Sequence, residues 1–386
     1  MKANPGGVVD PRNVYGRDRL ISGIWDQLDR LCLLMNAERR IGKTSVLRKM
    51  KHEPAPGWFP VFLDLETFHS AEEFAIAVYG QVQTYLNTWK KAANAARKIY
   101  EDHEFGDFKR TSGSRPWKAL LAAAVRDLVS EKQDVRLVFL WDELPYMIDH
   151  IRRANGEQAA VEVLDTLRSL RQEYTDLRMV FSGSIGLHHV LESIRDGKMS
   201  SEPVNDMYAI EVPPLDMEDA IKLAGDLIQG ENLSASDPGQ AAGVIAEESD
   251  CFPFYIHHVV AGLRQAGRSA EQSVIRDLVQ RQLVDANDPW DLGHYRRRIP
   301  AYYKKDATAQ LVGLILDTLA TAPDPLTVAQ LQSGVNNRST AFDSRDELVR
   351  VLRLMERDHY LLREPDGRIR FRFPLIRRWW ALDRGI

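Results

Sequence analysis

The stretch NAERRIGKTS, residues 36–45, decides the fold class of this chain. It follows an apolar run, LCLLM, and precedes VLRKM, a segment with helical spacing. A strand, a turn containing Gly-Lys-Thr and a helix N-terminus form the phosphate-binding arrangement of the motif G-x-x-x-x-G-K-[ST]. Ala37 stands in place of the first glycine, at the end of the predicted strand, where glycine helps the turn without touching phosphate. The stretch therefore predicts a site for a nucleotide phosphate.

The loop residues supply different chemical groups to the predicted site. Gly42 gives the backbone conformational freedom beside the phosphates, Lys43 supplies positive charge, and Thr44 supplies a hydroxyl ligand for Mg²⁺. The backbone N–H groups of the loop would point at the phosphates. The predicted nucleotide-binding residues here are Glu38, Arg39, Arg40, Ile41, Gly42, Lys43, Thr44 and Ser45.

A second motif should follow, because a metal-bound phosphate needs a carboxylate and water activation needs another. The segment LVFLWDELPYMI, residues 137–148, has both at the end of an apolar run. We predict that Asp142 holds Mg²⁺ through water and that Glu143 orients or deprotonates the attacking water. A solvated loop would also explain Asp-Glu after a strand. The presence of both motifs, in this order, favours a nucleotide site that hydrolyses ATP.

A third polar cluster, FSGSIG at residues 181–186, ends the next apolar run. Ser182 and Ser184 would then lie at a strand end beside Asp142, where a polar group can contact the γ-phosphate or position water. A Ser-Gly turn that satisfies its own backbone explains either serine equally well.

Residues 31–212 alternate short apolar runs with longer helical patterns, which predicts an α/β fold with a parallel sheet. Each run is nearly continuous, as expected for strands buried on both faces. The runs are residues 31–36, 61–66, 136–141, 178–183 and 208–212. The excursion at 70–133 predicts two or three helices with a mobile loop around 105–116.

The strand patterns stop after residue 214. Residues 215–292 have helical periodicity with turn residues between the helices, and 287–305 predicts a linker or packed connector. From 307, three helical patterns precede LLREPDGRIRFRF, a predicted hairpin, which is the plan of a winged helix. A capping box of Ser344 and Glu347 should start the third helix. Its predicted buried stripe is Leu348, Val351, Leu352 and Met355.

The composition fits a globular chain of two or three domains, with 386 residues, 44% of them apolar and 27% charged. No window approaches the ~20 uninterrupted apolar residues of a membrane helix, and residues 1–13 lack a secretory signal, so we expect a cytoplasmic protein without membrane contact. Cys32 and Cys251 predict two reduced core thiols. The net charge of −4 conceals a basic C-terminus, because residues 344–386 hold eleven arginines against seven acidic residues.

Five segments in this order resemble one known family: VYGRDRLI, AERRIGKTS, LVFLWDELPYMI, VFSGSIG and PPLDMEDAIKLA. They resemble the archaeal-type ATPases of the STAND branch of AAA+ proteins and are similar to origin-recognition initiators. The resemblance covers nearly the whole chain and is specific at the superfamily level. It implies a P-loop ATPase core at 1–213, a helical lid at 214–300 and a winged-helix domain at 301–386.

The resemblance implies further nucleotide contacts. Tyr15, Gly16 and Arg17 match the family's N-terminal box, which lies against the adenine and the phosphates. Pro253 matches the proline of a Gly-x-Pro in the lid that contacts the nucleotide, whereas Cys251 replaces the glycine. For an arginine finger the sequence offers only candidates.

The candidate arginine finger is Arg195, which follows the fourth predicted strand. Arg168 and Arg171, on the preceding predicted helix, are alternatives. An ordinary surface arginine is the simpler explanation for each of the three.

Adjacent histidine pairs occur at residues 188–189 and 257–258. Side chains of adjacent residues diverge on a helix, so we expect neither pair to bind a metal. The predicted nucleotide site therefore remains the one candidate for chemistry in the sequence.

The implied winged helix could contact DNA. Arginines decorate its predicted recognition helix and alternate along its wing, where they could meet phosphates. Acidic residues share that helix, and mixed charges also fit a solvated face. The predicted DNA contacts are Arg345, Arg350, Arg353, Arg370 and Arg372.

Two functions follow from the sequence. The first is a Mg-ATP-dependent, oligomerising switch ATPase that acts on DNA or a protein partner, with mobile-element control or defence as a setting. In it, nucleotide state opens and closes the lid against the core. The second is a nucleotide-gated winged-helix DNA-binding regulator or scaffold with little ATP turnover.

Overall fold

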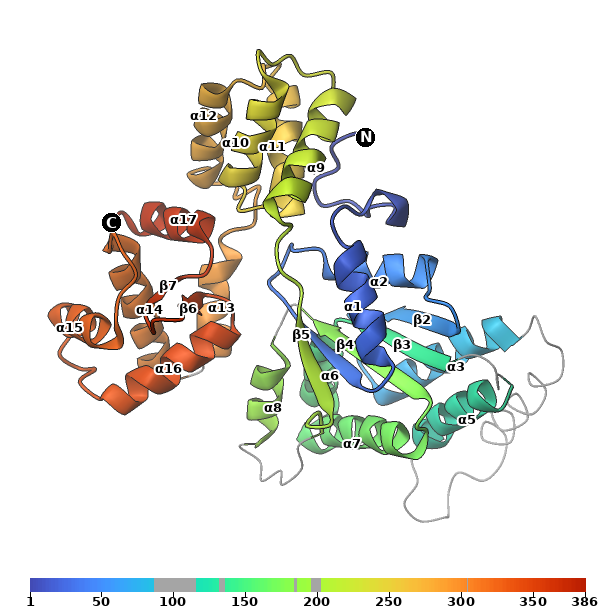
Figure 1. The fold of residues 1–386 in the computed structure, drawn as a ribbon. Coiled ribbons are helices and arrows are strands. Elements are labelled where there is room, and N and C mark those ends of the chain that lie inside the picture. The colour runs from blue at the N-terminus through green and yellow to red at the C-terminus, as the bar shows by residue number, and fades with distance from the viewer. Residues whose placement is uncertain (87–115, 132–135, 184–185, 196–202, 304) are drawn as a thin grey trace. The chain divides into compact units, whose positions relative to one another are not determined.

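The computed structural model describes all residues except 87–115, 132–135, 184–185, 196–202 and 304. The described residues form two compact units (Figure 1): one is Asp10–Val212, and the other combines Met1–Val9 with Pro213–Ile386. The chain therefore passes between the units twice, at residues 9–10 and 212–213. The division into core, lid and winged-helix domain stays a prediction. The mobile loop predicted around 105–116 falls almost entirely outside the described residues.

A parallel sheet, five-stranded in the described part of the chain, forms the centre of the Asp10–Val212 unit. Its strands are β1 (Cys32–Asn36), β2 (Trp58–Asp64), β3 (Arg136–Asp142), β4 (Leu177–Gly183) and β5 (Met207–Glu211). Their order is β2-β3-β4-β1-β5, with every neighbouring pair parallel. Each strand overlaps the apolar run that predicted it, which confirms the α/β fold class.

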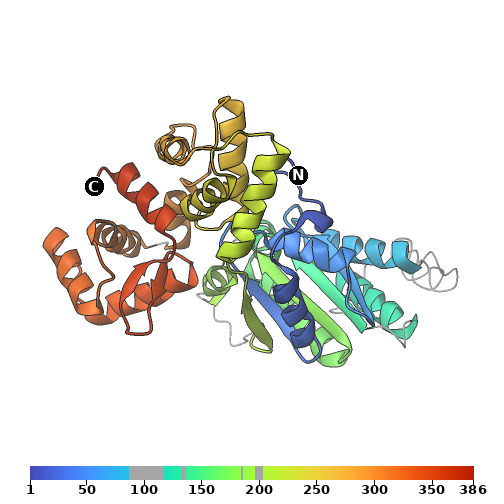
Figure 2. The ribbon, with the colours of Figure 1, turned by 45° about the horizontal axis from the view of Figure 1, so that its top comes forward.

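Helices cover both faces of the sheet (Figures 1 and 2). They are α1 (Asp18–Leu28), α2 (Lys43–His52), α3 (Ala71–Leu86), α5 (Pro116–Glu131), α6 (Leu144–Asn155), α7 (Glu157–Glu173) and α8 (Leu187–Arg195), after a 3-10 turn at Pro11–Asn13. Strand side chains alternate between faces, so Leu137, Phe139 and Trp141 pack with α3, α5, α6 and α7 in one large core. Val138 and Leu140 are buried outside that core, on the face that α1 and α2 cover.

Within the second unit, residues 215–292 contain helices and no strands, as their sequence pattern predicts. They are α9 (Met217–Gly230), α10 (Pro238–Glu248), α11 (Pro253–Gln265) and α12 (Gln272–Leu283). Asp216 and Asp237 start α9 and α10, because their carboxylates accept hydrogen bonds from the N3 amides of Asp219 and Gln240.

The first residues of the chain pack against this helical group. Ala3 N donates to Glu231 Oε1 (2.8 Å), and Asn4 N donates to Nδ1 of His257 (3.1 Å). Burial lowers the pKa of His257 to about 4, so its imidazole is neutral near pH 7 and can accept this hydrogen bond. The arm Met1–Val9 therefore belongs to the unit that resumes at Pro213, which no sequence pattern indicated.

The C-terminal elements are α13 (His294–Tyr302), α14 (Asp306–Thr321), α15 (Val328–Arg338), α16 (Arg345–Arg357), β6 (Leu361–Arg363), β7 (Ile369–Phe371) and α17 (Pro374–Arg384). Strands β6 and β7 pair antiparallel, which confirms the predicted hairpin. The buried stripe of α16 is the predicted one. Ser344 Oγ accepts from Glu347 N (3.3 Å), but the reciprocal capping box forms at Thr327 and Gln330 of α15 instead. The winged-helix assignment itself stays a prediction.

The structure describes the state of the two cysteines and the length and polarity of the helices. Cys32 and Cys251 are buried and unbridged, as predicted. Within the described residues, every helix is too short or too polar to cross a membrane.

The turn before α11 holds the N-terminus of α17. The carboxylate of Asp250 accepts a hydrogen bond from Leu375 N (2.7 Å), and so caps a helix whose own N-cap residue, Phe373, makes no side-chain cap. Phe252 packs edge to face on Phe373, with ring centroids 4.7 Å apart. Burial raises the pKa of Asp250 to about 6, although the Leu375 hydrogen bond lowers it.

Asp250→Asn is expected to change the pH dependence of stability. The pKa of the Asp250 carboxyl is higher in the folded chain than in the unfolded chain, so protonation of this carboxyl stabilises the fold. This stabilisation is present below about pH 4 and is lost as the pH rises to about 6. The asparagine oxygen can still accept the Leu375 hydrogen bond. As the pH rises from about 4 to about 7, the free energy of unfolding of Asp250→Asn should therefore increase relative to that of the wild type by roughly 2–3 kcal/mol.

Melting of the full chain, followed by tryptophan fluorescence across that pH range, measures the difference. Asp237→Asn, at the exposed cap of α10, is the matched control. If the difference in stability between Asp250→Asn and wild type stays constant across this pH range, the raised pKa of Asp250 is contradicted.

Candidate nucleotide site

The loop between β1 and α2 takes the form that phosphate binding requires. Strand β1 ends at Asn36 and α2 begins at Lys43, so the N-terminal amides of α2 stand at the end of the loop. Positive φ angles fall on Arg40 (69°) and Gly42 (102°), and Ala37 is not among the residues with positive φ. The backbone at Ala37 therefore has no need of glycine. The departure from the motif is compatible with the loop conformation.

Lys43 lies inside this loop and is only 6% exposed. Its Nζ donates to the carbonyl oxygens of Ala37 (3.0 Å) and Glu38 (3.1 Å). Burial lowers the pKa of Lys43, while the carboxylates of Glu143, Glu38 and Asp142 raise it. Phosphate oxygens would compete well for this ammonium, because charge-assisted hydrogen bonds are stronger than those to a neutral carbonyl.

Asp142, at the end of β3, is 1% exposed and joins three groups. Thr44 Oγ1 donates to its Oδ2 (2.5 Å), while Ser182 Oγ (2.9 Å) and Glu143 N (3.2 Å) donate to its Oδ1. A carboxylate this deeply buried requires donors or a cation beside it. Thr44 and Asp142 thus present oxygen atoms from two separate motifs at one point. Oxygen ligands of this kind are those that Mg²⁺ prefers, so the residues fit that ion.

The strand order explains how these residues meet. Strand β4 lies between β1 and β3, so Thr44, which follows β1, reaches Asp142 across the end of β4. Ser182 occupies that end, in register with Met35 of β1. Its hydroxyl therefore lies within hydrogen-bond distance of the Asp142 carboxylate, and its contact with the γ-phosphate stays a prediction.

Glu143 follows Asp142 in the left-handed conformation, with φ 55° and ψ 33°. This conformation is uncommon for residues other than glycine, costs energy, and is found most often at functional sites. The neighbouring Trp141 is fully buried and stacks between Phe139 and Phe181, with ring centroids 5.0 and 5.8 Å away. This packing supports the strand end that carries the two acidic residues.

Arg17 connects the predicted N-terminal box to the loop. Its side chain is buried, and its Nη2 donates to the carbonyl oxygen of Ile41 (2.9 Å). Gly16 precedes it with φ 59°, the conformation that glycine adopts without strain. The structure therefore gives Arg17 a role in holding the loop. Its contact with the phosphates, and that of Tyr15 with adenine, stay predictions.

The remaining predicted catalytic residues are Ser184 and the arginine-finger candidates. Ser184 falls outside the described residues, and Arg195 is the last residue of α8. Arg171 is buried and pairs with Asp206 through Nε (2.9 Å) and Nη2 (2.8 Å). Because this pair lies within the unit, Arg171 is a structural residue, and Arg195 and Arg168 remain the arginine-finger candidates.

Pro253 begins α11 in the other unit, and its contact with the nucleotide stays a prediction. Cys251, two residues earlier, has a φ of 58°. This is the position where the resemblance implies glycine, and the left-handed backbone gives the physical reason for that preference. Cys251 therefore adopts the left-handed turn despite the strain that this conformation imposes on a residue with a Cβ atom.

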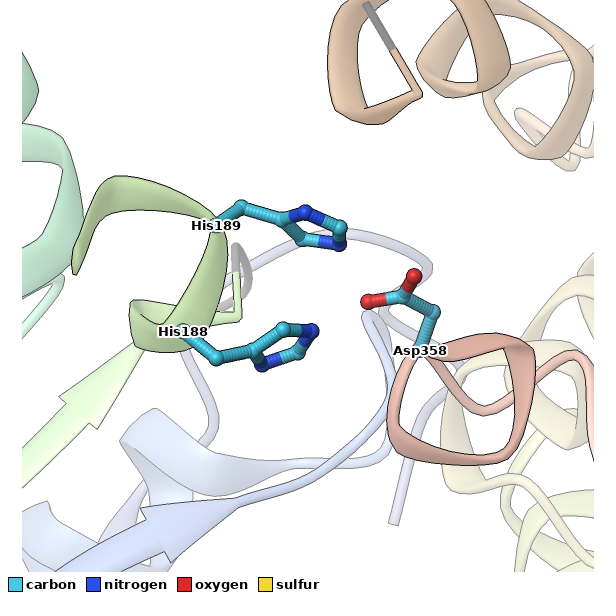
Figure 3. Close-up of side chains that lie close together, drawn as sticks. All are labelled: His188, His189 and Asp358. Atoms are coloured by element: carbon cyan, nitrogen blue, oxygen red, sulfur yellow. The ribbon is translucent and has the colours of Figure 1, made fainter. Parts of the chain in front are cut away.

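The expectation that adjacent histidines diverge is wrong for one pair. His188 and His189 lie in the first turn of α8, with ring centroids only 4.2 Å apart and ring planes inclined by 39° (Figure 3). The first turn of a helix has no preceding turn to restrict side-chain directions, so neighbouring rings can approach. Asp358, also drawn in Figure 3, belongs to the other unit, where it accepts a hydrogen bond from Tyr303 Oη (2.5 Å).

No protein-family model and no curated protein matches this sequence. The fold is nevertheless similar to solved structures. A Walker-type ATPase of Pyrococcus abyssi has a TM-score of 0.66 and 14% identity, over 96% of this chain and 97% of that one. The ORC2 protein of Aeropyrum pernix, solved as ADPNP-ADP complexes, has a TM-score of 0.54 and 11% identity, over 99% of this chain and 94% of that one. These likenesses show that the chain shares with these proteins a mixed α/β fold, whose parallel core is five-stranded in the described residues.

Proposed function

We propose that this protein is a Mg-ATP-dependent switch ATPase. The observation that carries the proposal is the 2.5 Å hydrogen bond between Thr44 Oγ1 and Asp142 Oδ2, which joins residues 98 positions apart. Each motif alone has a substantial rate of chance matches. A chance pair would have no reason to bring the hydroxyl of one motif onto the carboxylate of the other, beside a buried lysine.

The residues divide the proposed reaction between binding and proton transfer. Lys43 and the loop amides would bind the phosphates, and Thr44 and Asp142 would hold Mg²⁺, which would supply positive charge beside the phosphates. Glu143 accepts the proton of the attacking water. Ser182 Oγ, which donates a hydrogen bond to Asp142, would contact the γ-phosphate or position the water.

The second unit would convert nucleotide state into partner engagement. Its residues 214–300 are the proposed lid and 301–386 the proposed winged-helix domain, in a protein that we expect to form homo-oligomers and to engage DNA or a protein. The neighbour from Aeropyrum pernix was solved with ADPNP and ADP, which supports an adenine nucleotide as the ligand here.

A nucleotide-gated DNA-binding regulator with little turnover is the second candidate. Arg345, Arg350 and Arg353 are exposed along α16, which favours this surface for phosphate contacts. On the wing, Arg370 pairs with Glu364 at 2.9 Å, so its charge is already balanced. Helix α16, more than the wing, supports the DNA hypothesis.

Phosphate release by the full chain, in Mg²⁺ or in EDTA and with duplex DNA titrated in, separates the two candidates. We expect ATP-dependent release that EDTA abolishes and that DNA or a partner accelerates. Tight ATP binding without release under any condition would instead support the regulator. If neither binding nor release occurs, both proposals fail.

A further inference from the structure

The phosphate loop contains one acidic residue, Glu38, beside Arg39, Arg40 and Lys43. Its carboxylate has the same sign of charge as the phosphates that the loop is proposed to bind. The side chain is buried rather than directed into solvent, because Glu38 is only 2% exposed. A buried carboxylate is costly unless donors or cations stand beside it. The groups that compensate this charge therefore show what the side chain does.

The Glu38 carboxylate engages one of the backbone amides of the loop. Arg39 N donates to Glu38 Oε1 at 2.7 Å, the short distance typical of a charge-assisted hydrogen bond. Backbone N–H groups of a loop of this kind are the groups that bind phosphate oxygens. The carboxylate therefore holds a donor of the type that a phosphate oxygen would use.

Glu38 also contacts the lysine of the loop. Its carbonyl oxygen accepts a hydrogen bond from Lys43 Nζ (3.1 Å). Burial lowers the pKa of Lys43, and the Glu38 carboxylate is one of three nearby carboxylates that raise it. Glu38 thus stabilises the cationic form of Lys43. A single residue engages both the Arg39 amide and the Lys43 ammonium.

A phosphate group and the Glu38 carboxylate would compete for these donors. Each backbone N–H group supplies a single hydrogen, so the Arg39 amide cannot bind both anions at full strength. Two anions close together in a partly desolvated site also repel one another strongly. Nucleotide binding therefore requires the carboxylate to leave the Arg39 amide.

We propose that the Glu38 carboxylate is an internal competitor of the nucleotide phosphates, which lowers the affinity of the loop for ATP and ADP and speeds their release. The side chain turns away when the phosphates bind, and it takes the Arg39 amide again when they leave. The inference rests on the proposed nucleotide site and adds a residue that keeps the nucleotide exchangeable. A switch that returns to its starting state requires such exchange.

Glu38→Gln tests the proposal, because glutamine keeps the size of the side chain and an oxygen that can accept from Arg39 N, but removes the charge. We expect ADP and ATP to bind at least about tenfold more tightly. Most of this gain should come from slower release, as is usual for changes within one binding site. Glu38→Ala, which removes the carboxylate without a replacement, should change affinity in the same direction.

The probe is N-methylanthraniloyl-ADP, a fluorescent ADP analogue, bound to the full chain in the presence of Mg²⁺. Equilibrium titration gives its affinity, and displacement by excess ADP in a stopped-flow instrument gives its release rate. A merely structural role of Glu38 predicts the opposite result, since a damaged loop binds nucleotide less tightly.

Glu53→Gln is the matched control. Glu53 is exposed and directly follows α2, and its carboxylate lies 3.8 Å from Lys49 Nζ. The substitution therefore removes the same charge at the far end of the helix, about 15 Å from the loop. Affinity and release rate should stay within about threefold of wild type.

The contrary outcomes separate the inference from the proposed ATPase. If the analogue binds wild type but is released at the wild-type rate by both Glu38 variants, or is bound more weakly by both, the internal competitor is excluded and the nucleotide site stands. An equal gain in Glu53→Gln would assign the effect to net charge and also excludes the competitor. If wild type and all variants fail to bind the analogue, the nucleotide site itself is excluded, and the inference with it. Far-ultraviolet circular dichroism establishes that each variant is folded.

Discussion

Lys43→Ala is expected to lose at least about 30-fold in ATP affinity, since removing one partner of a buried charge pair costs roughly 2–5 kcal/mol. The ammonium of Lys43 lies inside the loop, on the carbonyl oxygens of Ala37 and Glu38. It is therefore already positioned for phosphates that the loop encloses. Without it, the bound triphosphate would face the carboxylates of Asp142 and Glu143 with less compensating charge. Equilibrium titration with a fluorescent ATP analogue measures the loss.

Lys49→Ala is the matched control for this substitution. Lys49 lies on the same helix and is 9% exposed, but its Nζ pairs with Asp18 (2.9 Å) rather than with the loop. This variant should keep ATP affinity within about threefold of wild type, the scale of ordinary indirect effects. Comparable losses in both variants would attribute the effect to a damaged α2, and retained affinity in Lys43→Ala would exclude the proposed site.

Glu143→Gln is expected to retain ATP and lower turnover by about 100–10,000-fold, the range for removal of a general base. Glutamine preserves the size of the side chain, so the left-handed turn after Asp142 can persist. The loop, Lys43 and the Mg²⁺ ligands are unchanged, and binding should therefore be intact or tighter. Single-turnover phosphate release and nucleotide retention, measured on the same sample, test both halves of this expectation.

Asp64→Asn is the matched control for Glu143→Gln. Asp64 ends β2 in register with Asp142 of the neighbouring strand, yet its side chain is exposed and accepts a hydrogen bond from Glu66 N. Removing its charge should leave turnover close to that of wild type. Undiminished turnover in Glu143→Gln would assign the proton transfer to another group.

The sequence was sufficient to predict the strands and the loop, because these depend on local patterns. The sheet is buried on both faces, so its strands appear as continuous apolar runs. Gly42, Lys43 and Thr44 stand at a strand-to-helix junction, where the chemistry of the loop is set by adjacent residues. Asp142 and Glu143 were recognisable for the same reason.

Other features depend on contacts between segments far apart in the chain, and local sequence patterns do not predict such contacts. The position of β4 between β1 and β3, which places Ser182 beside Asp142, is a property of strand order. The cap that Asp250 provides to α17 joins residues 125 positions apart. The approach of His188 to His189 has a local cause instead, the side-chain directions at a helix start, which spacing alone cannot specify.

The chain passes between its two units twice, so both ends of the Asp10–Val212 unit are covalently continuous with the other unit. Close to one junction, Arg17 donates to Ile41 of the phosphate loop, and at the other Val212 N donates to Asn36 O (3.1 Å), where that loop begins. Two residues at the ends of the phosphate loop, Asn36 and Ile41, are thus hydrogen-bonded to residues that lie near the two junctions in the sequence.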